Sequence, residues 1–235
     1  MTAPIRGLLF DKDGTLLDYD ASWPPINRDA AMLAAGGDAA LAARCLIAAG
    51  ADPTSGRAAA DSLLAAGNTR ELAACWRQAG SRRSVAALTA ELDALFQAAV
   101  TCMVPVCDLA PLFARLKQRG LALGIASSDS AAAVSATARH FGFAAMLDFA
   151  AGYDSGHGVK PGPGMALAFC AATGLHPREI AVIGDNSHDM AMGRAAGAGL
   201  LVAVLTGTGT PDTLASISDM RLASIADLES ALPTS

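Results

Sequence analysis

The hydrophobic and polar positions divide the chain into three stretches with different patterns. Residues 5–10 form a short apolar run that stops at Asp11, which is typical of a buried strand. From Asp29 to about Met103, Ala- and Leu-rich segments follow one another between breaks such as "AAGG" and "AGS", and they predict helices. After "VPVCD", short apolar runs alternate with helical segments. That alternation predicts a parallel sheet covered by helices on both faces.

The individual elements are predicted from apolar spacing and from capping residues. In the middle of the chain we expect helices at about 28–35, 38–49, 55–66, 69–79 and 84–102, with Thr69 and Ser84 as N-caps. In the last stretch we expect helices in "DLAPLFARLKQRG", residues 130–141, "GMALAFCAATG" and "DMAMGRAAGA". Strands are expected in "LALGIA", "MLDFAAG", "IAVIG" and "LLVAVL", and "RLASIADLESAL" predicts a short strand and a closing helix.

These elements predict a doubly wound, mainly parallel α/β fold with a small all-helical domain inserted after its first strand. The α/β core is expected to comprise residues 1–17 and 103–235, and the helical insert residues 18–102. The chain of 235 residues is long enough for this arrangement.

Composition and charge narrow the possible partners. The net charge is -5 and the chain has no basic block, which argues against nucleic acid as the main partner. The five cysteines are scattered without a metal-binding pair, as expected for reduced thiols in a cytoplasmic protein. We see no signal peptide and no charge-free apolar run of the roughly 18 residues that span a bilayer, so no membrane partner is expected.

The polar side chains that could carry chemistry follow the predicted strands. They are Asp11 and Asp13 after the first strand, Ser127 and Ser128 after "LALGIA", Lys160 in "GYDSGHGVKPGP", and Asp185 and Asp189 at and beyond the end of "IAVIG". Parallel sheets bind ligands beyond the carboxyl ends of their strands. If the strands are adjacent, these side chains share one pocket.

Several carboxylates in one pocket need a cation to offset their repulsion. Oxygen ligands without His or Cys at metal spacing favour a hard divalent ion, with Mg²⁺ the usual choice. Asp11 and Asp185 are expected to bind it directly, and Asp189 directly or through water.

The remaining polar groups suit a phosphoryl group. Lys160 offers a point charge, Ser127 a hydroxyl, and the backbone near Gly14 and Ser128 offers N–H donors. One carboxylate is then free to attack phosphorus, and another can carry a proton.

The motifs "DKDGT", Ser127 at a strand end, "VKPGP" and "GDNSHD" occur in this order, and together they resemble the haloacid dehalogenase superfamily. The position of the insert resembles the helical cap of the phosphoglycolate phosphatase-like branch.

The resemblance implies a role for each matching residue. Asp11 would be the nucleophile that becomes aspartyl-phosphate, and Asp13 the acid and base whose backbone carbonyl also faces Mg²⁺. Ser127 and Lys160 would hold the phosphoryl oxygens, with backbone donors at Gly14 and Ser128. Asp185 would bind the metal, assisted by Asp189.

The implied function is a Mg²⁺-dependent phosphatase, a hydrolase acting on a small phosphomonoester metabolite. Phosphoglycolate is the leading single candidate, followed by sugar phosphates and nucleoside monophosphates. Dehalogenases and phosphonoacetaldehyde hydrolases lack an acid at the position of Asp13, and the latter use a cap lysine that residues 18–102 do not contain.

A β-phosphoglucomutase-like activity stays open, because it would keep both aspartates. A non-enzymatic receiver module is the remaining alternative, although receivers place the phosphoacceptor after a middle strand. The sequence leaves open whether the protein is a monomer or a homodimer.

Two further segments have ambiguous patterns. The run "TGTGTP" at residues 206–211 follows the last long strand and is expected to be a plain loop. Asp18, Asp20 and Trp23 lie where the chain passes from core to insert, and could either line a substrate entrance or pack a hinge.

Overall fold

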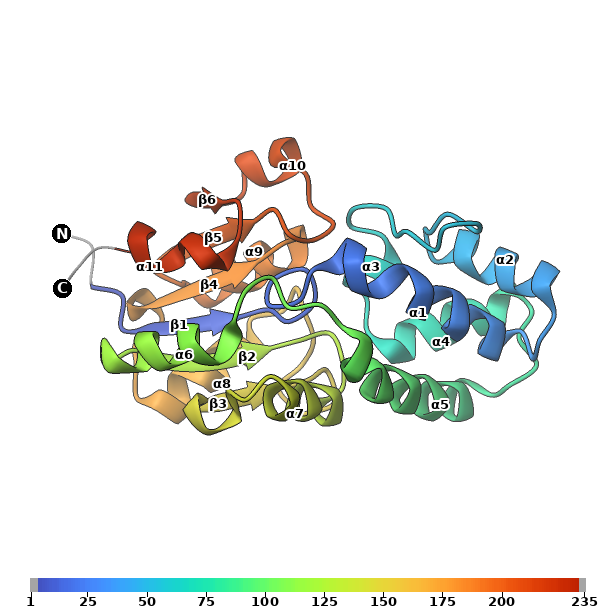
Figure 1. The fold of residues 1–235 in the computed structure, drawn as a ribbon, viewed down its shortest axis with the longest axis horizontal. Coiled ribbons are helices and arrows are strands. Elements are labelled where there is room, and N and C mark those ends of the chain that lie inside the picture. Colours follow the sequence, from blue (N-terminus) through green and yellow to red (C-terminus); the bar gives the residue numbers. More distant parts are fainter. Residues whose placement is uncertain (1–3, 233–235) are drawn as a thin grey trace.

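A six-stranded parallel sheet forms the centre of the computed structural model, which describes residues 4–232 (Figure 1). The strand order is β3-β2-β1-β4-β5-β6. The strands are β1 (Gly7–Phe10), β2 (Ala122–Ala126), β3 (Phe149–Ala151), β4 (Ile180–Gly184), β5 (Leu200–Val204) and β6 (Met220–Leu222). All neighbours in the sheet are parallel. The predicted doubly wound α/β fold is therefore confirmed.

Strand β1 lies at the centre of the sheet, and all four of its residues are buried. Phe10 is in register with Ile125 of β2 on one side and with Ile183 of β4 on the other. Side chains alternate between the two faces of a strand. Accordingly, Phe10 belongs to one hydrophobic cluster and Leu9 to a second cluster.

Helices cover both faces of the sheet. The cluster around Phe10 includes side chains of α6 (Leu109–Gln118), α7 (Ala131–His140) and α11 (Leu228–Ala231). The cluster around Leu9 includes side chains of α8 (Gly164–Thr173), α9 (Ser187–Ala196) and α10 (Pro211–Ala215). Short 3₁₀ turns complete the connections, at Ala144–Met146, Pro177–Glu179 and Ile225–Asp227.

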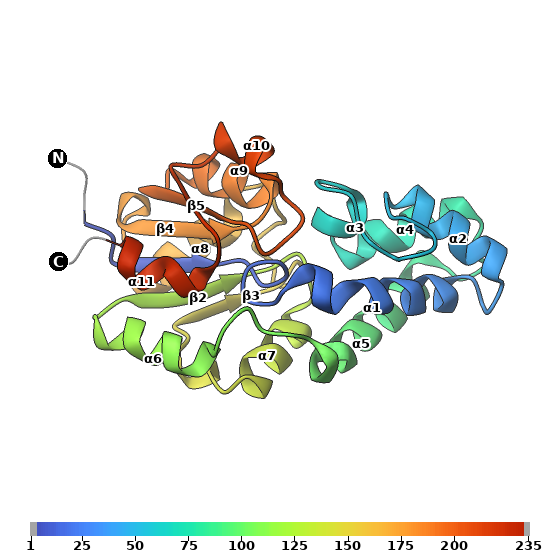
Figure 2. The same ribbon diagram turned by 45° about the horizontal axis from the view of Figure 1, so that its top comes forward.

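The helical insertion, as we call α1–α5, lies between β1 and β2 in the chain and beyond the carboxyl ends of the strands in space (Figures 1 and 2). Its helices are α1 (Tyr19–Ala34), α2 (Ala39–Ala48), α3 (Leu63–Ala66), α4 (Thr69–Ala79) and α5 (Val85–Ala98), followed by a 3₁₀ turn at Ala99–Cys102. Its buried side chains join the cluster around Phe10. The division into core and cap domains at residues 18 and 102 stays a prediction.

The first helix of the insertion differs from the prediction. Helix α1 begins at Tyr19 rather than near residue 28, although it contains Pro24 and Pro25. The Asp18 carboxylate caps it by accepting a hydrogen bond from the N–H of Ala21 at 2.9 Å. The two prolines have no backbone N–H and cannot donate helix hydrogen bonds. Burial of Tyr19 and Trp23 anchors the helix in spite of this loss.

The helix predicted at 55–66 is wrong except for its last four residues, which form α3. The Asp52 side chain accepts hydrogen bonds from the N–H groups of Thr54 and Ser55, and this local turn competes with a helix. The next helix, α4, is capped by Asn68 in a capping box with Glu71, so the predicted cap at Thr69 is one residue late.

One helical segment of the insertion is long and apolar enough to cross a membrane by length and composition. This segment, Val85–Cys102, has a mean hydropathy of 1.3, and the bent pair α1 and α2 passes the same test together. Helix α5 buries Leu88, Leu92 and Phe96 within the protein. Of the whole segment, 22% is buried, and length and composition alone do not distinguish a surface helix from a membrane span.

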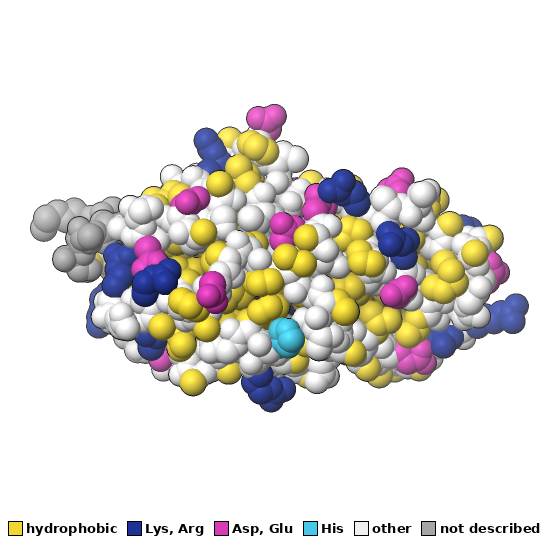
Figure 3. All heavy atoms as spheres, viewed as in Figure 1, with side chains coloured by type: hydrophobic (Ala, Val, Ile, Leu, Met, Phe, Trp, Pro, Cys, Tyr) yellow, Lys and Arg dark blue, Asp and Glu magenta, His cyan; other side chains and the backbone are white. Residues whose placement is uncertain are grey.

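Charged side chains of both signs lie scattered on the face shown in Figure 3. Several are paired across elements, as in Arg115 with Glu229 and Lys117 with Asp148. Exposed pairs of this kind each contribute at most about 1 kcal/mol. The apolar clusters therefore dominate the stability of the fold.

We expect Trp76→Phe to lower the free energy of unfolding by about 1–3 kcal/mol, because it removes a buried hydrogen bond between two helices and leaves a cavity where the larger ring was. Trp76 is fully buried, and its indole N–H donates to the carbonyl of Cys45 at 2.7 Å, joining α4 to α2. Urea unfolding monitored by circular dichroism measures the change. Met32→Ala is the control, since Met32 is 40% exposed on α1. Equal stability of the two variants would contradict this account.

Candidate active site

The candidate site lies at the point where the strand order reverses. Asp11 directly follows β1 and Asp185 directly follows β4, and these two strands are neighbours. Asp189 lies one turn into α9. Carboxylate oxygens of Asp11, Asp185 and Asp189 lie within 4.8 Å of one another, and all three residues are buried. The expectation that strand ends bring these acids together thus matches the geometry.

Lys160 lies between two of these acids. Its Nζ is 2.5 Å from Asp11 Oδ1 and 2.6 Å from Asp189 Oδ1, and the side chain is almost fully buried. Burial alone would lower the pKa of Lys160, but the two carboxylates offset this and hold its pKa above the ordinary value. Lys160 therefore brings a fixed positive charge to the Asp11 carboxylate.

The three carboxylates fit a hard divalent cation. Asp11 Oδ2 and Asp185 Oδ1 are buried oxygens without a hydrogen-bond partner. Burial, followed by repulsion from Asp11 and Asp189, raises the pKa of Asp185 well above its usual range. Both oxygens of Asp189 already accept hydrogen bonds, from Lys160 and from the N–H groups of Asp185 and Asn186. The oxygens open to a cation are those of Asp11 and Asp185.

Asp13 points to different partners from those of Asp11. Its carboxylate accepts a hydrogen bond from Trp23 Nε1 at 2.9 Å and pairs with Lys12 Nζ at 2.6 Å. Burial raises the pKa of Asp13 to about 6, against the opposing charge of Lys12. The side chain of Asp13 is outside the cluster of three acids, so its predicted metal contact through the backbone carbonyl stays a prediction.

Lys12 and Asp129 are site residues that the sequence analysis missed. Lys12 is fully buried, and its Nζ lies 3.0 Å from Asp129 Oδ2 and 5.7 Å from the centre of the Trp23 ring. The position of Lys12 between two motif aspartates was the available signal. Its pairing with Asp129 could not be read from spacing, because the two residues come from different strand ends.

The predicted phosphate-binding residues lie around the same point. Ser127 is buried, and its Oγ accepts a hydrogen bond from the N–H of Asp129 at 3.0 Å, which leaves the hydroxyl proton free to donate. Ser128 Oγ instead donates to the carbonyl of Ala66 at 3.1 Å. Gly14 has a φ of 88°, and a Cβ there would lie 2.6 Å from the Asp185 carboxylate. Glycine is therefore required at position 14.

The segment 206–209, expected to be a plain loop, packs against Asp185. The N–H of Thr208 donates to Asp185 Oδ2 at 2.8 Å, and Thr206 Oγ1 donates to the carbonyl of Gly14 at 2.7 Å. A Cβ on Gly207 would lie 1.9 Å from Asp185 Oδ2. Gly207 and Gly209 follow β5, whose carboxyl end lies at the same edge of the sheet as Asp185. These two glycines were the sequence signal for a close approach.

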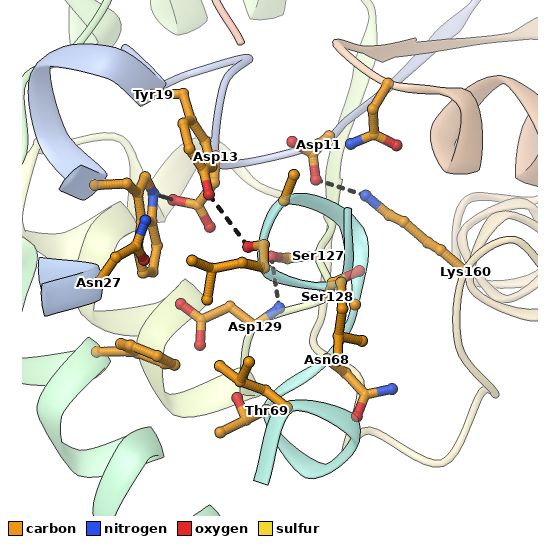
Figure 4. A pocket seen from close by; sticks show the side chains of 18 residues that line it. Asp11, Asp13, Tyr19, Asn27, Asn68, Thr69, Ser127, Ser128, Asp129 and Lys160 are labelled. Atoms are coloured by element: carbon orange, nitrogen blue, oxygen red, sulfur yellow. Dashed lines mark hydrogen bonds and ion pairs between the residues drawn. The ribbon is translucent and has the colours of Figure 1, made fainter. Parts of the chain in front are cut away.

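A cavity of about 590 Å³, counting the part open to solvent, lies between the strand ends and the insertion. Figure 4 shows Asp11, Asp13, Ser127 and Lys160 on its core side. Trp23 lines the cavity, whereas Asp18 caps α1 and Asp20 is an exposed partner of Arg57. Of the three residues left open above, only Trp23 faces the candidate site.

In three of the polar contacts between the core and the insertion, a hydroxyl group of the core is the donor. One is the bond from Ser128 to the carbonyl of Ala66. The others join Tyr153 Oη to Asp93 Oδ2 at 2.9 Å, and Ser187 Oγ to Asp61 Oδ1 at 2.7 Å. These bonds help to hold the insertion over the acid cluster.

The sheet order and the acids at its switch point define an α/β enzyme with an acidic ligand-binding centre. A family model for haloacid dehalogenase-like hydrolases matches residues 5–197. The chain therefore belongs to the haloacid dehalogenase-like hydrolases, which confirms the family predicted from the motifs. A phosphoglycolate phosphatase of Chromobacterium violaceum is 36% identical over 69 residues, which are 29% of this chain and 30% of that relative. The match spans about a third of the relative's length.

Solved structures with the same fold cover nearly the whole chain. A predicted phosphoglycolate phosphatase from Haemophilus somnus has a TM-score of 0.71 at 18% identity, covering 99% of this chain and 100% of that one. CbbY from Rhodobacter sphaeroides, in complex with phosphate, has a TM-score of 0.72 at 20% identity and covers 95% and 96%. A mutant of that CbbY binds xylulose-(1,5)bisphosphate, with the same score, identity and coverage. The prediction that the protein is an enzyme, a hydrolase, is confirmed by the family model, and these structures share its fold.

We expect Gly207→Ala to reduce phosphatase activity by about 10- to 100-fold, because the added methyl displaces the Asp185 carboxylate. Hydrolysis of p-nitrophenyl phosphate at a series of Mg²⁺ concentrations measures the loss, together with a direct Mn²⁺ binding titration. Leu205→Ala in the same segment is the control, since Leu205 is 39% exposed. If Gly207→Ala behaves like Leu205→Ala, the segment has no role in holding Asp185.

Proposed function

We propose that this protein is a Mg²⁺-dependent phosphatase that hydrolyses a small phosphomonoester through a phosphorylated Asp11. The observation that carries the proposal is the convergence of Asp11, Asp185 and Asp189 around Lys160 at the carboxyl ends of β1 and β4. Crowded buried carboxylates are unfavourable unless a cation offsets their charge. Such clusters therefore occur mainly at functional sites.

Asp11 and Asp185 would hold the metal ion, because each has a buried oxygen without a hydrogen-bond partner. Asp189 contributes mainly by fixing Lys160 and the backbone after β4. When bound, Mg²⁺ supplies positive charge that stabilises the phosphoryl oxygens during transfer.

Asp11 is the nucleophile in this proposal. Lys160 holds Asp11 Oδ1, so the side chain is fixed beside the cavity with one oxygen directed away from that bond. A carboxylate oxygen of Asp11 attacks phosphorus, the P–O bond to the substrate alcohol breaks, and an acyl phosphate forms. Lys160 then stabilises the charge on the transferred group.

Asp13 serves both halves of the reaction. Its carboxyl borders the cavity beside Asp11 and is held there by Lys12 and Trp23. It gives a proton to the leaving alcohol oxygen, and then takes one from the water that attacks the acyl phosphate. That second step releases phosphate and restores Asp11.

The Ser127 hydroxyl and the N–H of Ser128 would bind the phosphoryl oxygens, whereas the N–H of Gly14 already donates to the carbonyl of Leu17 at 2.8 Å. Ser127 is suited to this because its proton is free while its lone pair accepts from the N–H of Asp129. Donors that are fixed before the substrate arrives need no rearrangement during transfer.

The substrate would be a small phosphorylated metabolite, since the insertion covers the cavity. The names of similar proteins support phosphoglycolate as a reference compound, and the CbbY complexes support phosphorylated sugars. The expected location of the protein is the cytoplasm.

We expect Asp11→Asn to abolish turnover while leaving the fold intact, because the amide cannot form the acyl phosphate. Phosphate release and circular dichroism measure the two properties. The control is Asp20→Asn, since the side chain of Asp20 is 59% exposed and lies outside the cavity lining. More than a few per cent residual activity in Asp11→Asn would refute Asp11 as the nucleophile.

We expect Asp13→Asn to slow an alkyl phosphate far more than an aryl phosphate in the first half-reaction, because a phenolate leaves without a proton. General acid and base assistance is worth about 10²–10⁴ in each step. With p-nitrophenyl phosphate the variant should show a burst and accumulate phosphorylated Asp11, detectable by mass spectrometry. Equal slowing of both substrates, with no burst and no phosphorylated peptide, would refute this role.

A further inference from the structure

We propose that the organic part of the substrate is uncharged and brings hydroxyl donors, so that neutral phosphomonoesters are preferred to phosphoglycolate. This inference rests on the proposed phosphatase function and concerns the wall of the cavity opposite the acid cluster. That wall comes from the insertion and includes Trp23, Asn27, Leu64, Leu72 and Phe96.

The cavity has no cation for a second anionic group. Among the residues that the structure describes, Lys160 is the single cationic side chain in the lining, and it is bonded to Asp11 and Asp189. Arg28 and Arg57 of the insertion lie outside the lining and bind the carbonyl of Ser55 and the carboxylate of Asp20. A carboxylate on the substrate would lose its water without gaining a charged partner.

Two backbone donors at the border of the cavity are already used, and the charge at the start of α4 is negative. Within residues 4–232, the N–H groups of Leu64 and Gly67, which border the cavity, donate to the carbonyls of Ala49 and Leu63. At the start of α4 the Asn68 side chain accepts from the N–H of Glu71, and the Glu71 carboxylate accepts from the N–H of Asn68. The Glu71 charge already occupies this helix end and disfavours a second anion.

The charge balance at the site points in the same direction. Five carboxylates, from Asp11, Asp13, Asp129, Asp185 and Asp189, lie against two lysines, Lys12 and Lys160. The proposed Mg²⁺ ion would offset two of these negative charges, and the phosphoryl group of the substrate adds negative charge again. A second anion on the substrate would therefore meet repulsion that a hydroxyl group would not.

The cavity instead offers hydrogen-bond acceptors. Asn27 is 1% exposed, and its Oδ1 has no hydrogen-bond partner, while its Nδ2 donates to the carbonyl of Gly56. Asp129 Oδ2 lies 3.0 Å from Lys12 Nζ, and this ion pair already uses part of its acceptor capacity. Figure 4 shows Asn27 and Asp129 on the border of the same cavity. Unpaired buried acceptors favour a ligand that supplies O–H donors.

Apolar side chains complete the wall. The rings of Trp23 and Phe96 meet edge to face with centroids 5.2 Å apart, and Leu72 lines the cavity with them. These surfaces suit the C–H face of a polyol or sugar. The chemical class is therefore a neutral, hydroxyl-bearing alcohol esterified with phosphate.

Two matched pairs of substrates test the inference, because each pair differs only in a terminal carboxylate or hydroxymethyl group. The pairs are 2-phosphoglycolate with 2-hydroxyethyl phosphate, and 3-phosphoglycerate with glycerol 3-phosphate. We expect kcat/KM to favour the neutral member of each pair by about tenfold or more, since an unpaired buried charge is costly. Calorimetric binding of each compound to Asp11→Asn should show the same order.

A variant that adds a cation to the wall tests the cause. Leu64→Lys places an ammonium group in the lining, and Met32→Lys adds the same charge on α1 outside it. We expect Leu64→Lys to shift the kcat/KM ratio toward 2-phosphoglycolate by about tenfold, by supplying the missing partner. Met32→Lys should leave the ratio unchanged.

The outcomes separate this inference from the proposed function. If p-nitrophenyl phosphate and the neutral substrates are hydrolysed, and each exceeds its carboxylate partner, the inference stands. If phosphatase activity is present but the carboxylate members are equal or better, the inference fails and the proposed function survives. If no phosphomonoester is hydrolysed while Asp11 is intact, both fail.

Discussion

The burial of five carboxylates with two lysines at one end of a parallel sheet constrains the rest of the structure. Each lysine lies between two acids: Lys12 between Asp13 and Asp129, and Lys160 between Asp11 and Asp189. Buried charges of this kind are tolerated only when their partners are held in place. The two lysines therefore give the two motif aspartates separate surroundings, and these support separate roles for them.

The sequence was sufficient to predict the sheet and the family, and the structure brings several of the candidate site residues together. Apolar strands that end in Asp11 and Asp185 follow from pattern alone, because parallel strands bring their carboxyl ends together. The contacts of Lys12 and Gly207 could not be predicted in this way. Both depend on how loops from distant parts of the chain approach one another. The spacing of apolar residues along the sequence carries no information on such approaches. The predicted roles of the site residues still await the experiments described above.

Errors in the insertion have a related cause. Prolines argue against a helix in local terms, yet α1 passes through Pro24 and Pro25 because Trp23 packs against the core. An alanine-rich pattern argues for a helix, yet the chain turns at Asp52–Ser55 and only Leu63–Ala66 are helical in this stretch. Tertiary packing and side-chain hydrogen bonds can outweigh helix propensities, which differ by a few tenths of a kcal/mol for most residues and by about 3 kcal/mol for an interior proline.

The hydrogen bond from Ser128 to Ala66 has a thermodynamic consequence. Ser128 follows Ser127 in the chain, and Ala66 belongs to the insertion, so any separation of the two parts breaks this bond. An equilibrium between forms in which the insertion is open or closed would then be linked to binding of a phosphoryl group at Ser127 and Ser128. Linkage is reciprocal, so a ligand that binds more tightly to the closed form stabilises closure by the same factor. In that case the change in the open–closed equilibrium on ligand binding, and the difference in ligand affinity between the two forms, would report the same coupling free energy.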